Sequence, residues 1–346
     1  MCLYPKLIKN KKYISNKKNG GIVPPLPLIE VNGRLMEDLR VLEVPVGCGR
    51  CIECKKQKAR NWNVRLNEEI RNNHKHAKFI TLTFSNESYK ELYYATDKVK
   101  GYEKDNAIAT LGVRRFLERW RKQYKKSLRH WLVTELGKTG TEHIHLHGII
   151  WTTESNEELS LKWRYGYISI GKRRYDKGKA LNNYNTGYVN EQSINYITKY
   201  IHKQDEKHPN YKAKILTSAG IGKGYTQRHD SKRNKFKKRG TDETYKNRKG
   251  YKLALPIYYR NQIYSEEERE QLWLEKLDKE ERFVLGQRID ISQNDEQYYK
   301  ALKEAREKNK RLGYGTDNAT DDEKERKRIE QERRNLKHIQ RLKNGK

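Results

Sequence analysis

Long apolar runs are missing from this sequence of 346 residues. A transmembrane helix needs roughly 20 consecutive apolar residues, so we expect no membrane span. The stretch MCLYPKLIKNKKYISNKKNGG is basic but lacks a continuous apolar segment, which is not the pattern of a secretory signal. The sequence therefore favours a protein of the cytoplasm.

Cysteine is scarce: there are four, and three of them lie within seven residues. They are too few for a disulfide framework. Cys48, Cys51 and Cys54 have C-x₂-C-x₂-C spacing, and Cys2 or His74 could complete a set of four ligands. We interpret the cluster as a structural zinc site that ties the N-terminal segment to the helix that follows. Free thiols and an iron–sulfur cluster are the alternatives, because a second C-x₂-C pair is absent.

Acidic residues are outnumbered: 45 Asp and Glu face 76 Lys and Arg, which gives a net charge of +31. Each phosphate that such a protein neutralises releases condensed counterions. The 24 Tyr and 6 Trp are interleaved with the positive charge, and aromatic rings stack on unpaired bases. The composition predicts a nucleic-acid partner. A nucleotide-driven motor is not expected, because AGIGKGY (219–225) lacks the spacing of a phosphate-binding loop.

Alternating and helical apolar patterns predict an α+β fold, in which helices pack on an antiparallel sheet of ferredoxin-like type. The expected order is strand, helix, strand, strand, helix, strand and a final helix. These elements fall at residues 78–84, 107–125, 130–137, 142–151, 157–164, 165–171 and 190–203, with a turn at 138–141.

Four ranges describe the expected organisation. Residues 1–74 form an N-terminal segment, irregular up to residue 45, with the Cys cluster and a helix, and residues 75–205 form the core. Residues 206–312 form a basic loop and a helical extension. In that range 225–250 is nearly devoid of apolar residues and is expected to be flexible or ordered by nucleic acid. Residues 313–346 form a charged, solvated helix or tail.

The stretch HIHLHGII (143–150) places a histidine at every second position of a predicted strand. Side chains alternate with period two, so His143, His145 and His147 are expected on one face. If the hairpin pairs odd residues with odd residues, Glu135 joins them. His145, His147 and Glu135 then form an open metal site whose nitrogen and oxygen ligands suit Mg²⁺ or Mn²⁺, and also zinc. The alternative is a row of polar histidines that face solvent.

The helix INYITKYIHK (194–203) is amphipathic. One side carries Ile194, Ile197 and Ile201, and the other carries Tyr196, Lys199, Tyr200 and Lys203. Two tyrosines one turn apart, with lysines beside them, suit nucleophilic attack on a phosphate. The alternative is that these residues decorate a half-exposed helix.

Basic residues elsewhere are candidates for gripping a DNA backbone, although each could simply form a solvated face. They are Arg114, Arg115, Lys203, Lys235, Lys237 and Lys238.

Taken in order, FITLTF, HIHLHGII and YITKYIHK resemble the three motifs of the HUH endonuclease superfamily, with the two-tyrosine pattern of rolling-circle initiators. The chain also resembles the replication initiation proteins of microviruses of the gokushovirus group. That closer resemblance rests on MCLYPK, GCGRCIECKKQKARNW, LRHWLVTELG, TSAGIGKGYT and ALPIYYR.

The resemblance implies that Tyr196 and Tyr200 are nucleophiles, that Lys199 is the motif lysine, and that His145, His147 and Glu135 bind metal. It implies nicking of single-stranded or supercoiled phage origin DNA through a 5′-phosphotyrosine, followed by strand transfer and circle closure. Host helicase and polymerase would be partners in the host bacterial cytoplasm. His143 is extra to the motif, so a 143/145 ligand pair is the less favoured register.

Three alternatives remain at this point. A single-strand transposase or relaxase would use the same chemistry. A non-catalytic zinc protein would only bind nucleic acid, and a metallonuclease would hydrolyse DNA without a covalent intermediate.

Overall fold

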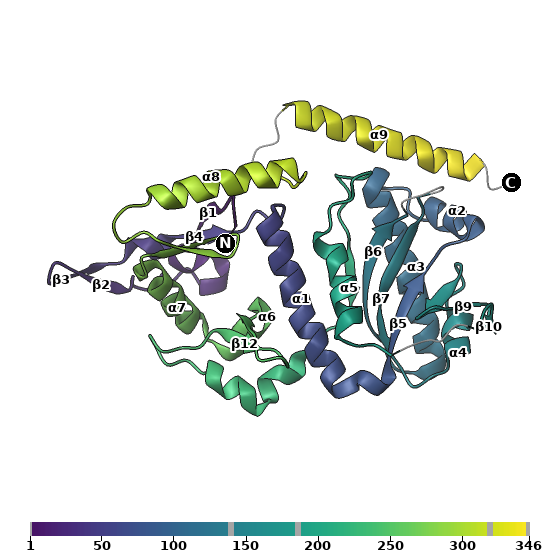
Figure 1. Cartoon of the computed structure of the whole chain (residues 1–346), viewed down its shortest axis with the longest axis horizontal. Coiled ribbons are helices and arrows are strands. Elements are labelled where there is room, and N and C mark those ends of the chain that lie inside the picture. Colours follow the sequence, from purple (N-terminus) through teal and green to yellow (C-terminus); the bar gives the residue numbers. More distant parts are fainter. Residues whose placement is uncertain (1, 138–141, 184–187, 317–320, 344–346) are drawn as a thin grey trace. The chain divides into compact units, whose positions relative to one another are not determined.

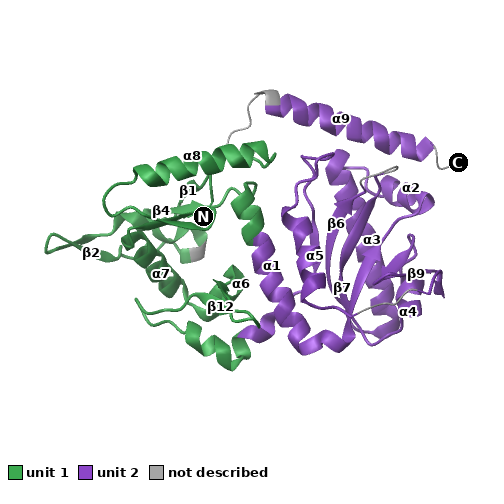
Figure 2. Ribbon diagram, viewed as in Figure 1, with its two compact units in different colours: residues 1–57, 226–318 green, residues 58–225, 319–346 purple. Residues whose placement is uncertain are grey.

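The computed structural model describes residues 2–137, 142–183, 188–316 and 321–343. The expected turn at 138–141 lies outside these residues. The chain divides into two compact units (Figure 2): unit 1 contains residues 1–57 and 226–318, and unit 2 contains residues 58–225 and 319–346. Segments distant in the sequence thus share a unit, a grouping that differs from the four consecutive ranges expected above. Throughout the described residues, every helix is too short or too polar to cross a bilayer.

Unit 2 is built on a seven-stranded sheet in which neighbouring strands are antiparallel (Figure 1). The strand order is β10-β9-β8-β5-β7-β6-β11. The α+β class expected from the sequence is confirmed. The strands are β5 (Ala77–Leu82), β6 (Arg129–Leu136), β7 (Ile144–Trp151), β8 (Ile168–Ile170), β9 (Arg173–Asp176), β10 (Lys179–Ala180) and β11 (Ile215–Thr217).

Helices cover both faces of this sheet because its central strands are apolar on both sides. On one face, Trp131 and Ile149 pack with Ile194 and Ile197. On the other face, Leu132 and its neighbours pack against the remaining helices. The first face is covered by α1 (Ile52–Asn73) and α5 (Glu191–His202), and the second by α2 (Asn86–Tyr94), α3 (Gly101–Tyr124) and α4 (Asn156–Lys162).

The C-terminal helix α9 (Asp321–Lys343) also belongs to unit 2 and packs against α2 and α3 (Figure 1). The expectation of a fully solvated helix is wrong, because Arg334 and His338 are buried. Hydropathy misses this contact, since the buried residues are polar and gain their partners only in the fold.

Unit 1 consists of two-stranded ribbons and short helices. Residues before 45, expected to be irregular, form three of its strands and part of the fourth. The pairs are β1 (Lys6–Lys9) with β4 (Glu43–Val46), β2 (Leu28–Val31) with β3 (Arg34–Glu37), β12 (Thr244–Lys246) with β13 (Lys252–Ala254), and β14 (Glu281–Val284) with β15 (Gln287–Asp290). The helices are α6 (Ile257–Ile263), α7 (Glu266–Asp278) and α8 (Glu296–Arg311).

The basic segment 225–250 is folded, contrary to the expectation of a flexible loop. It contains a 3₁₀ helix (His229–Asn234) and strand β12. Asn234 is fully buried, and its side-chain amide donates to the carbonyls of Asp242 at 2.5 Å and Thr244 at 2.9 Å. Hydrogen bonds from polar side chains therefore order a segment whose composition resembles that of a disordered one.

Candidate active site and metal centres

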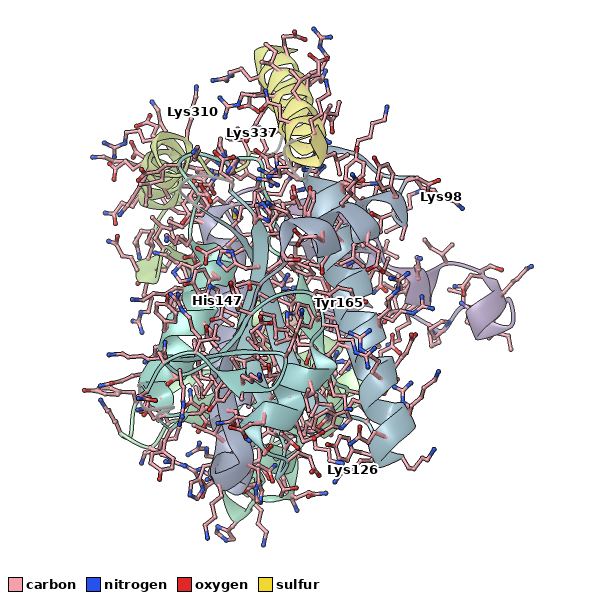
Figure 3. The ribbon with its side chains drawn as sticks, turned by 90° about the vertical axis from the view of Figure 1, so that its right-hand side faces the viewer. Lys98, Lys126, His147, Tyr165, Lys310 and Lys337 are labelled. Atoms are coloured by element: carbon pink, nitrogen blue, oxygen red, sulfur yellow. The ribbon has the colours of Figure 1, made fainter. Side chains whose placement is uncertain are left out.

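The two central strands bring three metal-binding side chains to one face of the sheet. Glu135 on β6 lies directly opposite His145 on β7, and His147 lies two residues further along. The Nε2 atoms of His145 and His147 are 3.2 and 3.0 Å from Oε2 of Glu135. His147 is labelled in Figure 3. The odd-with-odd pairing expected from the hairpin is present, and three ligand atoms converge.

Each imidazole is oriented through its other nitrogen. Nδ1 of His147 is 2.9 Å from Oγ1 of Thr81, which lies opposite it on β5. Nδ1 of His145 is 3.2 Å from the carbonyl oxygen of His143. Metal-binding histidines commonly have the second nitrogen tied in this way. The sequence analysis assigned Thr81 no role, although the alternation in FITLTF places it on the histidine face.

His143 does not share that face, so this expectation is wrong. Its ring lies 5.4 Å from Tyr89 of α2, which packs on the opposite side of the sheet. The strand begins at Ile144, and Glu142 before it has φ 50°, so period-two alternation does not extend to residue 143. Burial and nearby arginines lower the pKa of His143 to about 4.

The two tyrosines of α5 lie beside these ligands. The Tyr200 hydroxyl donates to that of Tyr196 at 2.6 Å. The ring of Tyr200 stacks on His147, with centroids 4.9 Å apart and planes 7° apart. Two phenols and two imidazoles therefore form one continuous cluster, as their separate patterns in the sequence do not reveal.

Two features hold α5 in this place. Asn190 caps the helix, because its side chain accepts from the Ser193 N–H at 2.9 Å. Ile194 and Ile197 are fully buried against the sheet. The opposite side of the helix consequently projects the tyrosines and lysines outward, as helical spacing requires.

Electrostatics distinguish the titratable groups of the site. Burial alone would favour the neutral carboxyl of Glu135, but hydrogen bonds from His145 and His147 outweigh it and lower its pKa to about 2. Burial lowers the pKa of His147. Burial, with the Tyr196 hydrogen bond and the Glu135 charge, raises the pKa of Tyr200. Tyr196 is 49% exposed. The carboxylate is thus ionised and both ligand rings present Nε2 to a common point.

These groups line a pocket of about 560 Å³. Its chemistry combines a carboxylate, two imidazoles, two phenols and two ammonium groups. The donor set of two nitrogens and one oxygen fits a divalent cation and leaves coordination positions for a ligand. The lining residues are Glu135, Leu136, His145, His147, Tyr196, Lys199, Tyr200 and Lys203.

A second ligand cluster lies in unit 1 and consists of the four cysteines. Their Sγ atoms all lie within 4.8 Å of one another, and the pairs Cys2–Cys51 and Cys48–Cys54 are 3.9 and 4.0 Å apart. Sulfurs of a tetrahedral zinc site lie about 3.8 Å apart, given a Zn–S bond of about 2.3 Å. The cluster could hold a metal such as zinc, and Cys2 rather than His74 completes the set.

Backbone amides point at these sulfurs. The N–H groups of Tyr4 and Cys48 donate to Sγ of Cys2 at 3.3 and 3.2 Å, and that of Cys51 donates to Sγ of Cys48 at 3.3 Å. Such bonds stabilise negative charge on sulfur. The arrangement therefore suits thiolate ligands.

The predicted DNA-gripping residues are dispersed. Arg114 and Arg115 lie on α3, across the sheet from the pocket, in ion pairs with Glu118 and Glu91. Lys203 lines the pocket. The other three, Lys235, Lys237 and Lys238, are exposed residues of unit 1.

The glycine-rich loop is structural. The Gly222 N–H donates to Glu69 at 2.7 Å, and the Gly220 carbonyl accepts from Arg129 at 2.9 Å. An amide that already points at a carboxylate does not cradle a phosphate.

Residues 77–205 match a family model of replication-associated proteins of the ORF2 type. The match covers less than half of the chain but extends from β5 to beyond α5, and includes every residue that lines the pocket. It supports a replication-initiator role with DNA as the partner. No curated protein and no solved structure gave a significant match.

Proposed function

We propose that this protein is a metal-dependent tyrosine endonuclease and strand transferase of the HUH type, which initiates rolling-circle replication. One observation carries the proposal: the paired hydroxyls of Tyr196 and Tyr200 share a pocket with Glu135, His145 and His147. A purely structural row of histidines has no need of two phenols stacked beside it.

The fold supports the same proposal. The order β8-β5-β7-β6 within the antiparallel sheet suits a ferredoxin-like arrangement, with the helices α2, α3 and α4 on one face. In the proposed HUH type, the central hairpin carries the ligands and α5, on the other face, carries the nucleophiles.

The chemistry begins with attack by a tyrosine oxygen on the scissile phosphorus. The new Tyr–O–P bond replaces the P–O3′ bond, the phenol loses its proton, and the departing 3′ oxygen is protonated. A bound Mg²⁺ or Mn²⁺ would polarise the phosphate oxygens. Lys199 and Lys203 offset the negative charge that builds on the phosphate, and Glu135, His145 and His147 are the ligands.

The second tyrosine allows a second transfer at the same place. After one round of synthesis it attacks the regenerated origin, and the released 3′-hydroxyl then attacks the first phosphotyrosine to close a circle. Because the hydroxyls are 2.6 Å apart, neither step requires α5 to move far.

The resemblance to microvirus initiators sets the proposed context. The substrate is the single-stranded or supercoiled origin DNA of a phage, and host helicase and polymerase act with the protein in the bacterial cytoplasm. The four cysteines are proposed to bind a structural zinc ion that fixes unit 1.

A covalent-capture assay tests the proposal. The protein is incubated with circular single-stranded phage DNA and Mn²⁺ or Mg²⁺, and then denatured in detergent. We expect a protein–DNA adduct that is lost in the Tyr196→Phe/Tyr200→Phe double variant and in His145→Ala. Metal-dependent nicking that survives loss of both tyrosines would instead establish a hydrolase. Binding without any cleavage would support a non-catalytic protein.

A further inference from the structure

The helix α9 is attached to unit 2 through polar side chains. Its buried residues are Arg334, at 2% exposure, and His338, at 1%. At the start of α3, the Asn335 side chain accepts from the Gly101 N–H at 2.7 Å, and the Gln331 side chain donates to the carbonyl of Lys100 at 3.0 Å. Polar bonds place a partner with more directional precision than apolar contact does.

Arg334 joins two carboxylates in the interior. Its guanidinium donates to both oxygens of Asp105 on α3, at 2.8 and 2.7 Å. It also donates to the carboxylate of Glu142 at 3.2 Å and to the carbonyl of the same residue at 3.1 Å. Arg334 therefore holds both the side chain and the backbone of Glu142, where the chain enters β7.

Glu142 in turn connects the two halves of the pocket. Lys337 of α9, labelled in Figure 3, contacts its carboxylate at 2.5 Å. Lys207 and His208, in the segment that follows α5, approach the same carboxylate, His208 at 3.3 Å. Burial would raise the pKa of Glu142, but ion pairs with Lys207 and Lys337 lower it to about 2. The ionised carboxylate thus links the ligand hairpin to the end of the tyrosine helix.

The backbone carries this position to a metal ligand. The residue after Glu142 is His143, whose carbonyl accepts from the Gly137 N–H at 3.0 Å and lies 3.2 Å from Nδ1 of His145. A shift of Glu142 moves that carbonyl and with it the contact that orients the His145 ring.

From these contacts we infer that Arg334 is a positioning residue of the active site. Through Glu142 it fixes the open end of the β6–β7 hairpin, and so holds His145 and Glu135 in register with Tyr196 and Tyr200. The chemical part of this inference rests on the proposed function; the mechanical part, that α9 secures the hairpin, does not.

The test uses the full chain and separates the two parts. Arg334→Met keeps the length of the side chain and removes its charge. Glu142→Gln keeps the backbone carbonyl and weakens only the side-chain links. Arg333→Met is the matched control, because Arg333 is exposed on the same helix. Hydrogen exchange by mass spectrometry compares residues 142–147 with residues 129–133, at the other end of the hairpin. Mn²⁺ binding is measured directly by its paramagnetic signal.

We expect Arg334→Met to speed exchange at 142–147 by about tenfold or more relative to 129–133, and to weaken Mn²⁺ binding by roughly 10- to 100-fold, the usual cost of losing a supporting group. Glu142→Gln should act in the same direction but less, and Arg333→Met should change neither quantity. Equal acceleration at both ends of the hairpin would show a merely structural role and overturn the inference, as would no change at either end.

The two proposals can fail separately. If His147→Ala leaves Mn²⁺ binding unchanged, the proposed metal site is wrong. The exchange comparison still decides whether Arg334 secures the hairpin.

Discussion

The two ligand clusters of this protein differ in every property that matters for a metal. In unit 1, four sulfurs surround a point, three amide groups donate to two of them, and the surroundings include the buried side chains of Leu3 and Ile52. In unit 2, two imidazoles and one carboxylate meet at the edge of an open pocket, beside two phenols and two lysines. Four ligands close a site, whereas three leave room for a reacting group.

The contrast shows how one chain can separate holding a structure from performing chemistry. The sulfur cluster draws its ligands from two distant stretches of sequence, so a bound metal would cross-link them. The histidine cluster draws its ligands from one hairpin that the sheet already fixes, so a metal there would add reactivity rather than order. Each prediction below tests whether this division holds.

The largest effect is expected from Cys51→Ser. Loss of one ligand of a closed zinc site removes binding free energy that reaches about 10 kcal/mol or more in small zinc domains. Zinc content should fall and proteolysis should increase within residues 1–57 and 226–318. Mn²⁺ binding in unit 2 should persist. A variant with wild-type zinc content would refute the closed site.

The next effect is expected from His147→Ala, which removes a ligand from the open site. Adduct formation should fall by at least about 100-fold, the upper end of what loss of a mere supporting group costs. Zinc content and the melting temperature should change little. His76→Ala, an exposed histidine, is the control. Equal loss of zinc in His147→Ala would break the comparison.

A smaller effect is expected from Thr81→Val, which keeps the shape of the side chain but loses the contact with Nδ1 of His147. Mn²⁺ binding should weaken by roughly 10-fold, measured by titration calorimetry. Thr81→Ser retains the hydroxyl and should restore it. If Ser and Val behave alike, the hydroxyl does not orient the ring.

The smallest effect concerns the first nick. Tyr196 is the more exposed phenol, and Tyr200 donates to it. We therefore expect Tyr200→Phe to slow the first nick only about fivefold, the loss of one hydrogen bond of about 1 kcal/mol. Tyr196→Phe should abolish that nick, while circle closure should require both residues. Time courses on linear and circular origin DNA distinguish the steps; the reverse ranking would make Tyr200 the first nucleophile.

Period-two and helical patterns were sufficient to predict much of the candidate site. The alternation of HIHLHGII and the pairing of the hairpin bring Glu135 next to His145, and the wheel of residues 194–203 separates Ile194 from Tyr196. These predictions work because side-chain direction in a regular element depends only on sequence spacing.

Contacts between polar residues of distant segments could not be predicted in this way. The burial of Arg334 depends on Asp105, more than two hundred residues earlier in the chain. Asn234 orders a basic segment through carbonyls, which every residue type supplies. Helix α2 was missed because its apolar side consists of residues such as Tyr89 and Leu92 within a polar stretch.

The hydrogen bond between the two phenols has a further consequence for the strand ends. If one oxygen carries DNA while the other waits 2.6 Å away, the second reactant is never dissolved in the surrounding solution. Effective molarities of well-oriented groups reach roughly 10⁵–10⁸ M. The fidelity of rejoining would then depend on the spacing of two side chains on one helix rather than on the abundance of the protein or its DNA in the cell.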